Sequence, residues 1–235
     1  MEKQGFRVKG WGLGIARRWG LLVVFITLGW AVSAAKAEEA SLRITVRVYD
    51  YAAVSPEILA AAEEETARIL HAAGIGTEWL DCTVQQGTNP NDDTCRRPFG
   101  PADLIVRILP EPMAARLPFR NITLGFALLT EEGGYGFVAG VLYQKVESLA
   151  NETHTDRYHI LGHGIAHEIG HLLLRTLKHN GRGLMRANWG PEELQLACRG
   201  LLRFTPEEAA RLRAEVRMRL IGSTAATTTE IALSR

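Results

Sequence analysis

One stretch constrains the fold more than any other, from Tyr158 to Trp189, and it contains the pentapeptide His167-Glu168-Ile169-Gly170-His171. On a helix, residues four apart lie on the same face, so both imidazoles project together with the carboxylate beside them. The neighbouring positions are apolar: Ile165, Ala166, Ile169, Leu172, Leu173 and Leu174. We therefore predict a buried helix from near Asp156 to about Thr176. An H-E-x-x-H pattern on such a helix offers two ligands to one zinc ion and a general base. The alternative is a core helix with incidental histidines.

His159 and His163 extend the same four-residue stripe. In a rival pair His163–His167, Gly164 occupies the position of the base, and glycine cannot accept a proton. The register His167–His171 is therefore favoured. His163 is then either a partner that supports a ligand or an ordinary core or cleft histidine.

A catalytic zinc ion takes three protein ligands and keeps one position open. No aspartate follows Asp156, so the remaining candidates for the third ligand are His179, Glu192 and Glu193. His179 is favoured because Asn180-Gly181 after it is a strong turn signal, which lets the chain double back to the metal. The two glutamates fit better in the first turn of a helix.

The zinc pattern and the tripeptide Gly183-Leu184-Met185 together resemble the metzincin metalloproteases, most closely the matrixin-like members. That family has the pattern H-E-x-x-H-x-x-G-x-x-H and a methionine-containing turn beneath the metal. The resemblance implies that Met185 forms a hydrophobic floor. Leu174 and Leu177 stand where the family has its glycine and its third histidine. We therefore expect the helix to run about half a turn further, with the third ligand displaced to His179.

The resemblance also implies a function: a zinc endopeptidase in which His167, His171 and His179 bind the metal and Glu168 is the general base. A peptide or protein substrate is expected along an edge strand within Gly136–Tyr143. Two alternatives stay open, a catalytically silent zinc-binding module for protein interaction and a purely structural secreted protein.

The first 37 residues have the composition of a signal peptide. Basic residues precede an apolar run from Leu21 to Val32, and Ala35-Lys36-Ala37 is typical of a cleavage site. The run is about a dozen residues long, short of the roughly 20 that a membrane-spanning helix needs. We expect export to the periplasm or the medium, with no membrane association after cleavage; a membrane anchor is the alternative.

Residues 38–220 are expected to form one catalytic domain, and residues 221–235 a disordered tail. With 235 residues, of which 46% are hydrophobic and 23% charged, the composition is that of a globular protein. The net charge of +1 gives no indication of a nucleic-acid partner. Nothing in the sequence specifies an oligomeric state.

The three cysteines are Cys82, Cys95 and Cys198. In an exported protein disulfides persist, and the pair Cys82–Cys95 would close a polar loop. Cys198 lies in a predicted helix and is expected to be a buried free thiol.

Hydrophobic periodicity and turn signals predict the remaining elements. Three prolines at 110, 112 and 118 are expected to exclude regular structure there, and residues 146–150 are expected to form only a short helical turn. Strands are predicted at 41–50, 75–80, 102–109, 124–129 and 136–143, and helices at 55–73, 190–198 and 205–220. The order predicts an α+β fold, a metzincin-like mixed, twisted sheet with the active-site helix and a smaller, mostly helical carboxy-terminal subdomain.

Overall fold

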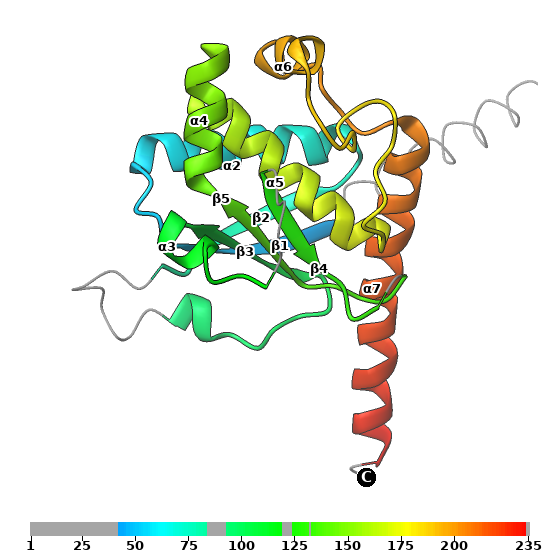
Figure 1. The fold of residues 1–235 in the computed structure, drawn as a ribbon. Coiled ribbons are helices and arrows are strands. Elements are labelled where there is room, and N and C mark those ends of the chain that lie inside the picture. The colour runs from blue at the N-terminus through cyan, green and yellow to red at the C-terminus, as the bar shows by residue number, and fades with distance from the viewer. Residues whose placement is uncertain (1–41, 84–92, 119–123, 132, 234–235) are drawn as a thin grey trace, which may run out of the picture. The chain divides into compact units, whose positions relative to one another are not determined.

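The computed structural model describes residues 42–83, 93–118, 124–131 and 133–233, which belong to one compact unit, Ala40–Arg235 (Figure 1). The predicted signal segment lies outside the described residues. Within the described part, no helix has the length and hydropathy needed to cross a membrane.

Five strands form one mixed sheet in the order β2-β1-β3-β5-β4 (Figure 1). Strands β2, β1, β3 and β5 are parallel to one another, and β4 pairs antiparallel with β5. The strands are β1 (Arg43–Asp50), β2 (Gly76–Asp81), β3 (Asp103–Leu109), β4 (Gly125–Leu128) and β5 (Val138–Leu142). The predicted α+β class, the mixed sheet and the parallel pair at its start are confirmed.

Two helices, α2 (Pro56–Ala72) and α5 (Arg157–Leu174), pack against each other and against the sheet. Their contact is close because Gly162 has no side chain, and a Cβ there would lie 2.8 Å from the Ala62 carbonyl oxygen. Thr66 Oγ1 donates to the Gly162 carbonyl at 2.9 Å. This contact fixes the position of α5, the predicted active-site helix, on the domain.

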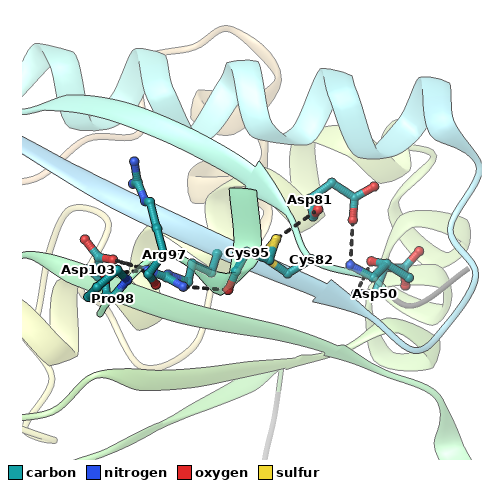
Figure 2. Close-up of a disulfide and its surroundings, with 9 residues drawn as sticks. Asp50, Asp81, Cys82, Cys95, Arg97, Pro98 and Asp103 are labelled. Atoms are coloured by element: carbon teal, nitrogen blue, oxygen red, sulfur yellow. Dashed lines mark hydrogen bonds and ion pairs between the residues drawn. A yellow bond between two sulfur atoms is a disulfide. The ribbon is translucent and has the colours of Figure 1, made fainter. Parts of the chain in front are cut away.

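The disulfide Cys82–Cys95 is present, as predicted, and holds the short 3-10 helix η1 (Asp93–Arg96) near the end of β2 (Figure 2). Arg47 in β1 lies beneath this segment with a side chain only 5% exposed. It pairs with Asp103 at 2.7 Å and donates to the Cys95 carbonyl at 3.0 Å. The covalent link and the contacts of Arg47 therefore attach η1 to the sheet.

The segment after β3 differs from the prediction, because Glu111–Ala114 forms a short helix, α3. Pro110 is its N-cap and Pro112 lies in its first turn. At these positions the missing N–H of proline would have had no helical partner, so proline does not prevent a helix from starting. The prolines mark where α3 begins instead of excluding it.

Two helices of the second half, α4 and α7, are longer than predicted. α4 (Tyr143–Thr153) replaces the expected short turn, and α6 (Pro191–Cys198) agrees with the sequence. α7 (Pro206–Leu233) continues past the predicted end at Leu220 and through residues expected to be disordered. No proline follows Pro206, and alanine and leucine near the end favour helix, which offsets the small polar residues.

Cys198 was predicted to be buried, but the free thiol is exposed. It is the last residue of α6, and its apolar neighbour Ala197 is the one that faces the core. The helical period places adjacent residues on different faces, and the cysteine falls on the outer one.

Replacing both bridged cysteines, as in the variant Cys82→Ala/Cys95→Ala, should lower the free energy of unfolding by roughly 3 kcal/mol, because the unfolded chain regains the freedom of the closed loop. Urea denaturation of the purified protein measures this. Cys198→Ala is the matched control and should change stability by less than about 0.5 kcal/mol. Equal midpoints for wild type and double variant would contradict this role of the disulfide.

Candidate metal centre

The imidazoles of His167 and His171 lie together on α5, with their Nε2 atoms 3.0 Å apart. The Nδ1 atom of His167 is 2.8 Å from the Leu184 carbonyl oxygen, and that of His171 is 2.7 Å from the Thr176 carbonyl oxygen. A carbonyl oxygen can only accept, so each Nδ1 carries the proton and donates. Both Nε2 atoms are then unprotonated and direct their lone pairs to one point.

His179 completes the group from the loop after α5. Its Nε2 atom lies 3.3 Å from that of His171, and one ring nitrogen from each of the three histidines lies within 4.8 Å of the others. Ligands about 2.05 Å from a tetrahedral zinc ion are about 3.4 Å apart, so these spacings suit such an ion. Unprotonated nitrogens this close repel one another unless a cation lies between them, and three imidazoles are a zinc ligand set. The residues present therefore fit zinc.

Burial keeps these histidines neutral, which is the form that binds metal. Desolvation, with a smaller effect of the neighbouring imidazoles, lowers the pKa of His167 to about 3 and that of His171 to about 4. Desolvation also lowers the pKa of the more exposed His179.

The turn after α5 determines which residue reaches the centre. The helix ends at Leu174, and Arg175 adopts a left-handed conformation with φ 55°. The expected extension of half a turn is wrong: the left-handed residue comes one position after the place of the family's glycine. Leu177, at the place of the family's third histidine, is 53% exposed, and the chain brings His179 to the centre instead.

The chain then returns beneath the centre through Leu184 and Met185, which are 0% and 1% exposed. The Asn180 N–H donates to the Met185 carbonyl at 2.8 Å and closes the loop behind His179. A Cβ on Gly170 would lie 2.6 Å from the Met185 sulfur. Gly170, one of the two variable residues of the zinc pattern, thus makes room for the methionine against the helix.

Arginine side chains of α7 stabilise the end of α5, from which this turn departs. Arg219 donates to the Leu172 carbonyl at 3.1 Å and to the Gly136 carbonyl at 3.2 Å. Arg211 donates to the Leu174 carbonyl at 3.1 Å. The Leu172 and Leu174 carbonyls lie at the end of α5, where cations interact favourably with the helix dipole. The carboxy-terminal helix therefore stabilises the end of the helix from which the turn departs.

Glu168 is 5% exposed, and its desolvation raises the pKa of the carboxyl to about 8. Gly125 at the start of β4 is the residue that makes room for it: a Cβ there would lie 2.8 Å from Glu168 Cγ and 2.6 Å from the Gly140 carbonyl oxygen. The edge strand thus passes directly beside the predicted base.

A cavity of about 680 Å³ opens over these residues. Its lining includes His167, Glu168, His179 and the strand residue Gly125; the rest are Leu124, Lys145, Ser148, Leu149, Glu152, Gly164, Arg186, Ala187, Asn188 and Trp189. The edge strand beside it is β4. The segment Gly136–Tyr143, expected to contain the substrate-binding edge strand, contains β5 instead. This strand pairs with β3 on one side and with β4 on the other, so it is not an edge. That expectation is wrong, because the chain order of strands does not give their order in the sheet.

The other residues considered as ligands lie elsewhere. Glu193 caps α6, accepting the Gly190 N–H at 2.9 Å and pairing with Arg186. Glu192 is exposed in the same first turn. His163 is fully buried and packs edge-on against Trp189, whose indole N–H donates to the Leu184 carbonyl at 3.2 Å.

Sequence reasoning missed Gly125, Trp189 and the two carbonyls of Leu184 and Thr176. Backbone acceptors leave no sequence signal, since every residue has one. Gly125 would have needed the strand order, whereas Trp189 carried a weak signal as a large aromatic residue shortly after the methionine turn.

Comparison with solved structures gives a distant structural likeness. No protein-family model and no curated protein matches the chain. Among solved structures, archaemetzincin from Methanopyrus kandleri matches with 16% sequence identity and a TM-score of 0.43, covering 75% of this chain and 96% of that one. An overlap this loose carries no argument about activity, so the functional proposal rests on the side chains of the site.

In the metal-free protein, Glu168 should make stability fall as the pH rises. Its folded pKa of about 8 exceeds the ordinary 4.5, so its contribution is complete below about pH 4.5 and lost as the pH passes 8. Glu168→Gln should flatten the decrease in unfolding free energy between pH 6.5 and 8.5, measured by urea denaturation with chelator. Glu63, whose pKa burial raises to about 7, contributes to both proteins alike, so their difference isolates Glu168. Identical slopes would show that Glu168 is ionised without metal.

Proposed function

We propose that this protein is a zinc-dependent endopeptidase that hydrolyses peptide bonds in an exported location. The observation that supports it most is the convergence of three imidazole nitrogens from His167, His171 and His179 beside the buried carboxyl of Glu168, at the floor of an open cavity. A purely structural protein has no use for unprotonated nitrogens packed against one another.

When bound, zinc would increase the acidity of a water molecule and polarise the scissile carbonyl. The task of Glu168 is to accept the proton of that water and deliver it to the leaving amine. Its position immediately after His167 in the helix places the carboxyl beside the ligands. The positive charge of an ion would favour the carboxylate, offsetting the desolvation that keeps the metal-free group protonated at neutral pH.

Substrate is proposed to bind along β4. Among the described residues this strand pairs in the sheet only with β5, so it is an edge strand, the place where an extended peptide would add to a sheet. Gly125 at its start lies against Glu168, which would bring a peptide paired with this strand close to the base. The cavity would accommodate charged and apolar side chains of the substrate, because Lys145 and Glu152 line it together with Leu149.

Export is proposed from the basic residues, apolar run and cleavage pattern of residues 1–37. The disulfide Cys82–Cys95 is consistent with an oxidising compartment. Periplasm and medium are equally compatible with these features.

Glu168→Gln should abolish peptide cleavage, a loss of at least about 100-fold, because an amide cannot accept the proton of water. The zinc content should stay unchanged, since all three histidines remain. The assay incubates zinc-loaded protein with a diverse peptide mixture and identifies cuts that disappear with chelator. Cleavage by the variant at the wild-type rate would reject the role of Glu168, and the absence of chelator-sensitive cuts by wild type would favour a silent zinc-binding module.

His179→Ala should weaken zinc binding at this centre by at least about 10-fold, because two imidazoles then hold the ion in place of three. Zinc affinity measured by competition with a coloured chelator tests this. His154→Ala, which removes an exposed histidine from the end of α4, is the matched control and should leave the affinity unchanged. An unaltered affinity in His179→Ala would show that the third ligand comes from another residue.

A further inference from the structure

A second cluster of metal-binding side chains lies on the same helix, further toward its start. It consists of Glu65 from α2 with His159 and His163 from α5, and one ligand atom from each lies within 4.8 Å of the others. The two histidines are four residues apart, as in the first centre, and so lie on one face of α5.

The distances within this cluster suit coordination better than hydrogen bonding. Glu65 Oε1 lies 3.5 Å from His163 Nδ1 and 3.8 Å from His159 Nδ1. Hydrogen bonds between nitrogen and oxygen measure about 2.7–3.2 Å. Two ligands of a tetrahedral zinc ion are about 3.4 Å apart, given bonds of about 2.0–2.2 Å. Neither contact between the carboxylate and an imidazole is therefore a hydrogen bond, and the three groups are close enough to share an ion.

Two nitrogens of the cluster have no hydrogen-bond partner. They are His159 Nδ1 and His163 Nε2, and both are buried. Buried polar atoms are nearly always satisfied by a partner, and exceptions need a reason. For His159 Nδ1, which faces the carboxylate of Glu65, a bound cation supplies that partner.

The carboxylate is prepared for this role by Arg68, which donates to its two oxygens at 2.9 and 2.6 Å. Burial raises the pKa of Glu65, but the hydrogen bonds from Arg68 and the charges nearby outweigh it, so the net pKa is lowered. Glu65 is thus ionised and fixed in orientation, as ligating carboxylates are. Oε1 keeps a second lone pair for a metal.

We propose that Glu65, His159 and His163 form a second site for a divalent transition metal such as zinc, bridging α2 and α5. Two imidazoles and a carboxylate are a known zinc ligand set. Without metal, His163 Nδ1 donates to the His159 carbonyl at 2.8 Å. Metal binding at Nδ1 breaks this hydrogen bond, turns the ring away from the carbonyl and moves the proton to Nε2. The His159 carbonyl keeps the N–H of the helix as its donor.

The surroundings define what this site does. His163 is fully buried and the side chain of Glu65 is 9% exposed, whereas that of His159 is 14% exposed and is the point of entry. The site joins the two helices where Gly162 packs against Ala62 and Glu65. Its role is to fix the active-site helix to the domain. The positive charge of Arg68 makes it the weaker of the two sites.

The test is zinc stoichiometry of the purified protein at saturating zinc, with zinc as the only added metal. Wild type should bind two ions per chain. Glu65→Gln, which keeps the size of the side chain, and His159→Ala, at the most exposed ligand, should each bind one and keep the tighter site. His71→Ala, an exposed histidine on α2, is the matched control and should bind two.

His171→Ala separates this inference from the proposed endopeptidase centre. If both sites exist, it should retain one ion, and its melting temperature should still rise on adding zinc, a rise that Glu65→Gln on the same background abolishes. One ion in wild type and in Glu65→Gln, with none in His171→Ala, overturns the second site and leaves the first. If Glu65→Gln loses zinc and His171→Ala does not, the second site is supported and the first is rejected. No bound zinc in wild type rejects both.

Discussion

Two hydrogen bonds from ring nitrogens to backbone carbonyls determine what this site can be. The Leu184 and Thr176 carbonyls hold the protons of His167 and His171 on Nδ1, and this leaves both Nε2 atoms free to coordinate. Because carbonyl groups do not titrate, the choice of tautomer does not depend on pH. The two acceptors come from the turn after α5 and from the methionine turn. The path of residues 175–185 therefore matters to the metal twice: it positions His179 and it fixes the protons on the other two ligands.

That path depends on contacts distant in sequence. A left-handed residue with a side chain costs roughly 1 kcal/mol, and Arg175 is in that conformation where glycine would be unstrained. Its guanidinium lies over the ring of Tyr135 at 4.3 Å, which helps to offset the cost. Arg219 and Arg211 from α7 bind the last carbonyls of α5. The carboxy-terminal helix thus supports the metal centre, although none of the side chains described for it lines the cavity over that centre.

The sequence predicted the parts of the site that local spacing determines. The i, i+4 pair His167 and His171 follows from helical geometry alone, and His179 followed from a turn signal plus the exclusion of other donors. The class of fold followed from alternating strands and capped helices. Residue spacing does not determine the lateral order of strands, so the sequence predicts a substrate-binding edge within Gly136–Tyr143, whereas the edge strand beside the site is β4. Helix ends were misjudged where proline lies in a first turn, at α3, and where a polar tail continues a helix, at α7.

The three imidazoles are unequal in their access to solvent: His167 and His171 are buried, and His179 is exposed. An ion leaving the site would have to break its bonds one at a time, and the outermost bond is the one that solvent and competing ligands reach first. The rate of exchange would then be governed by fluctuations of the loop that carries His179, while all three imidazoles determine the equilibrium constant. How long the ion stays would depend on loop stiffness, which can change without a change in affinity.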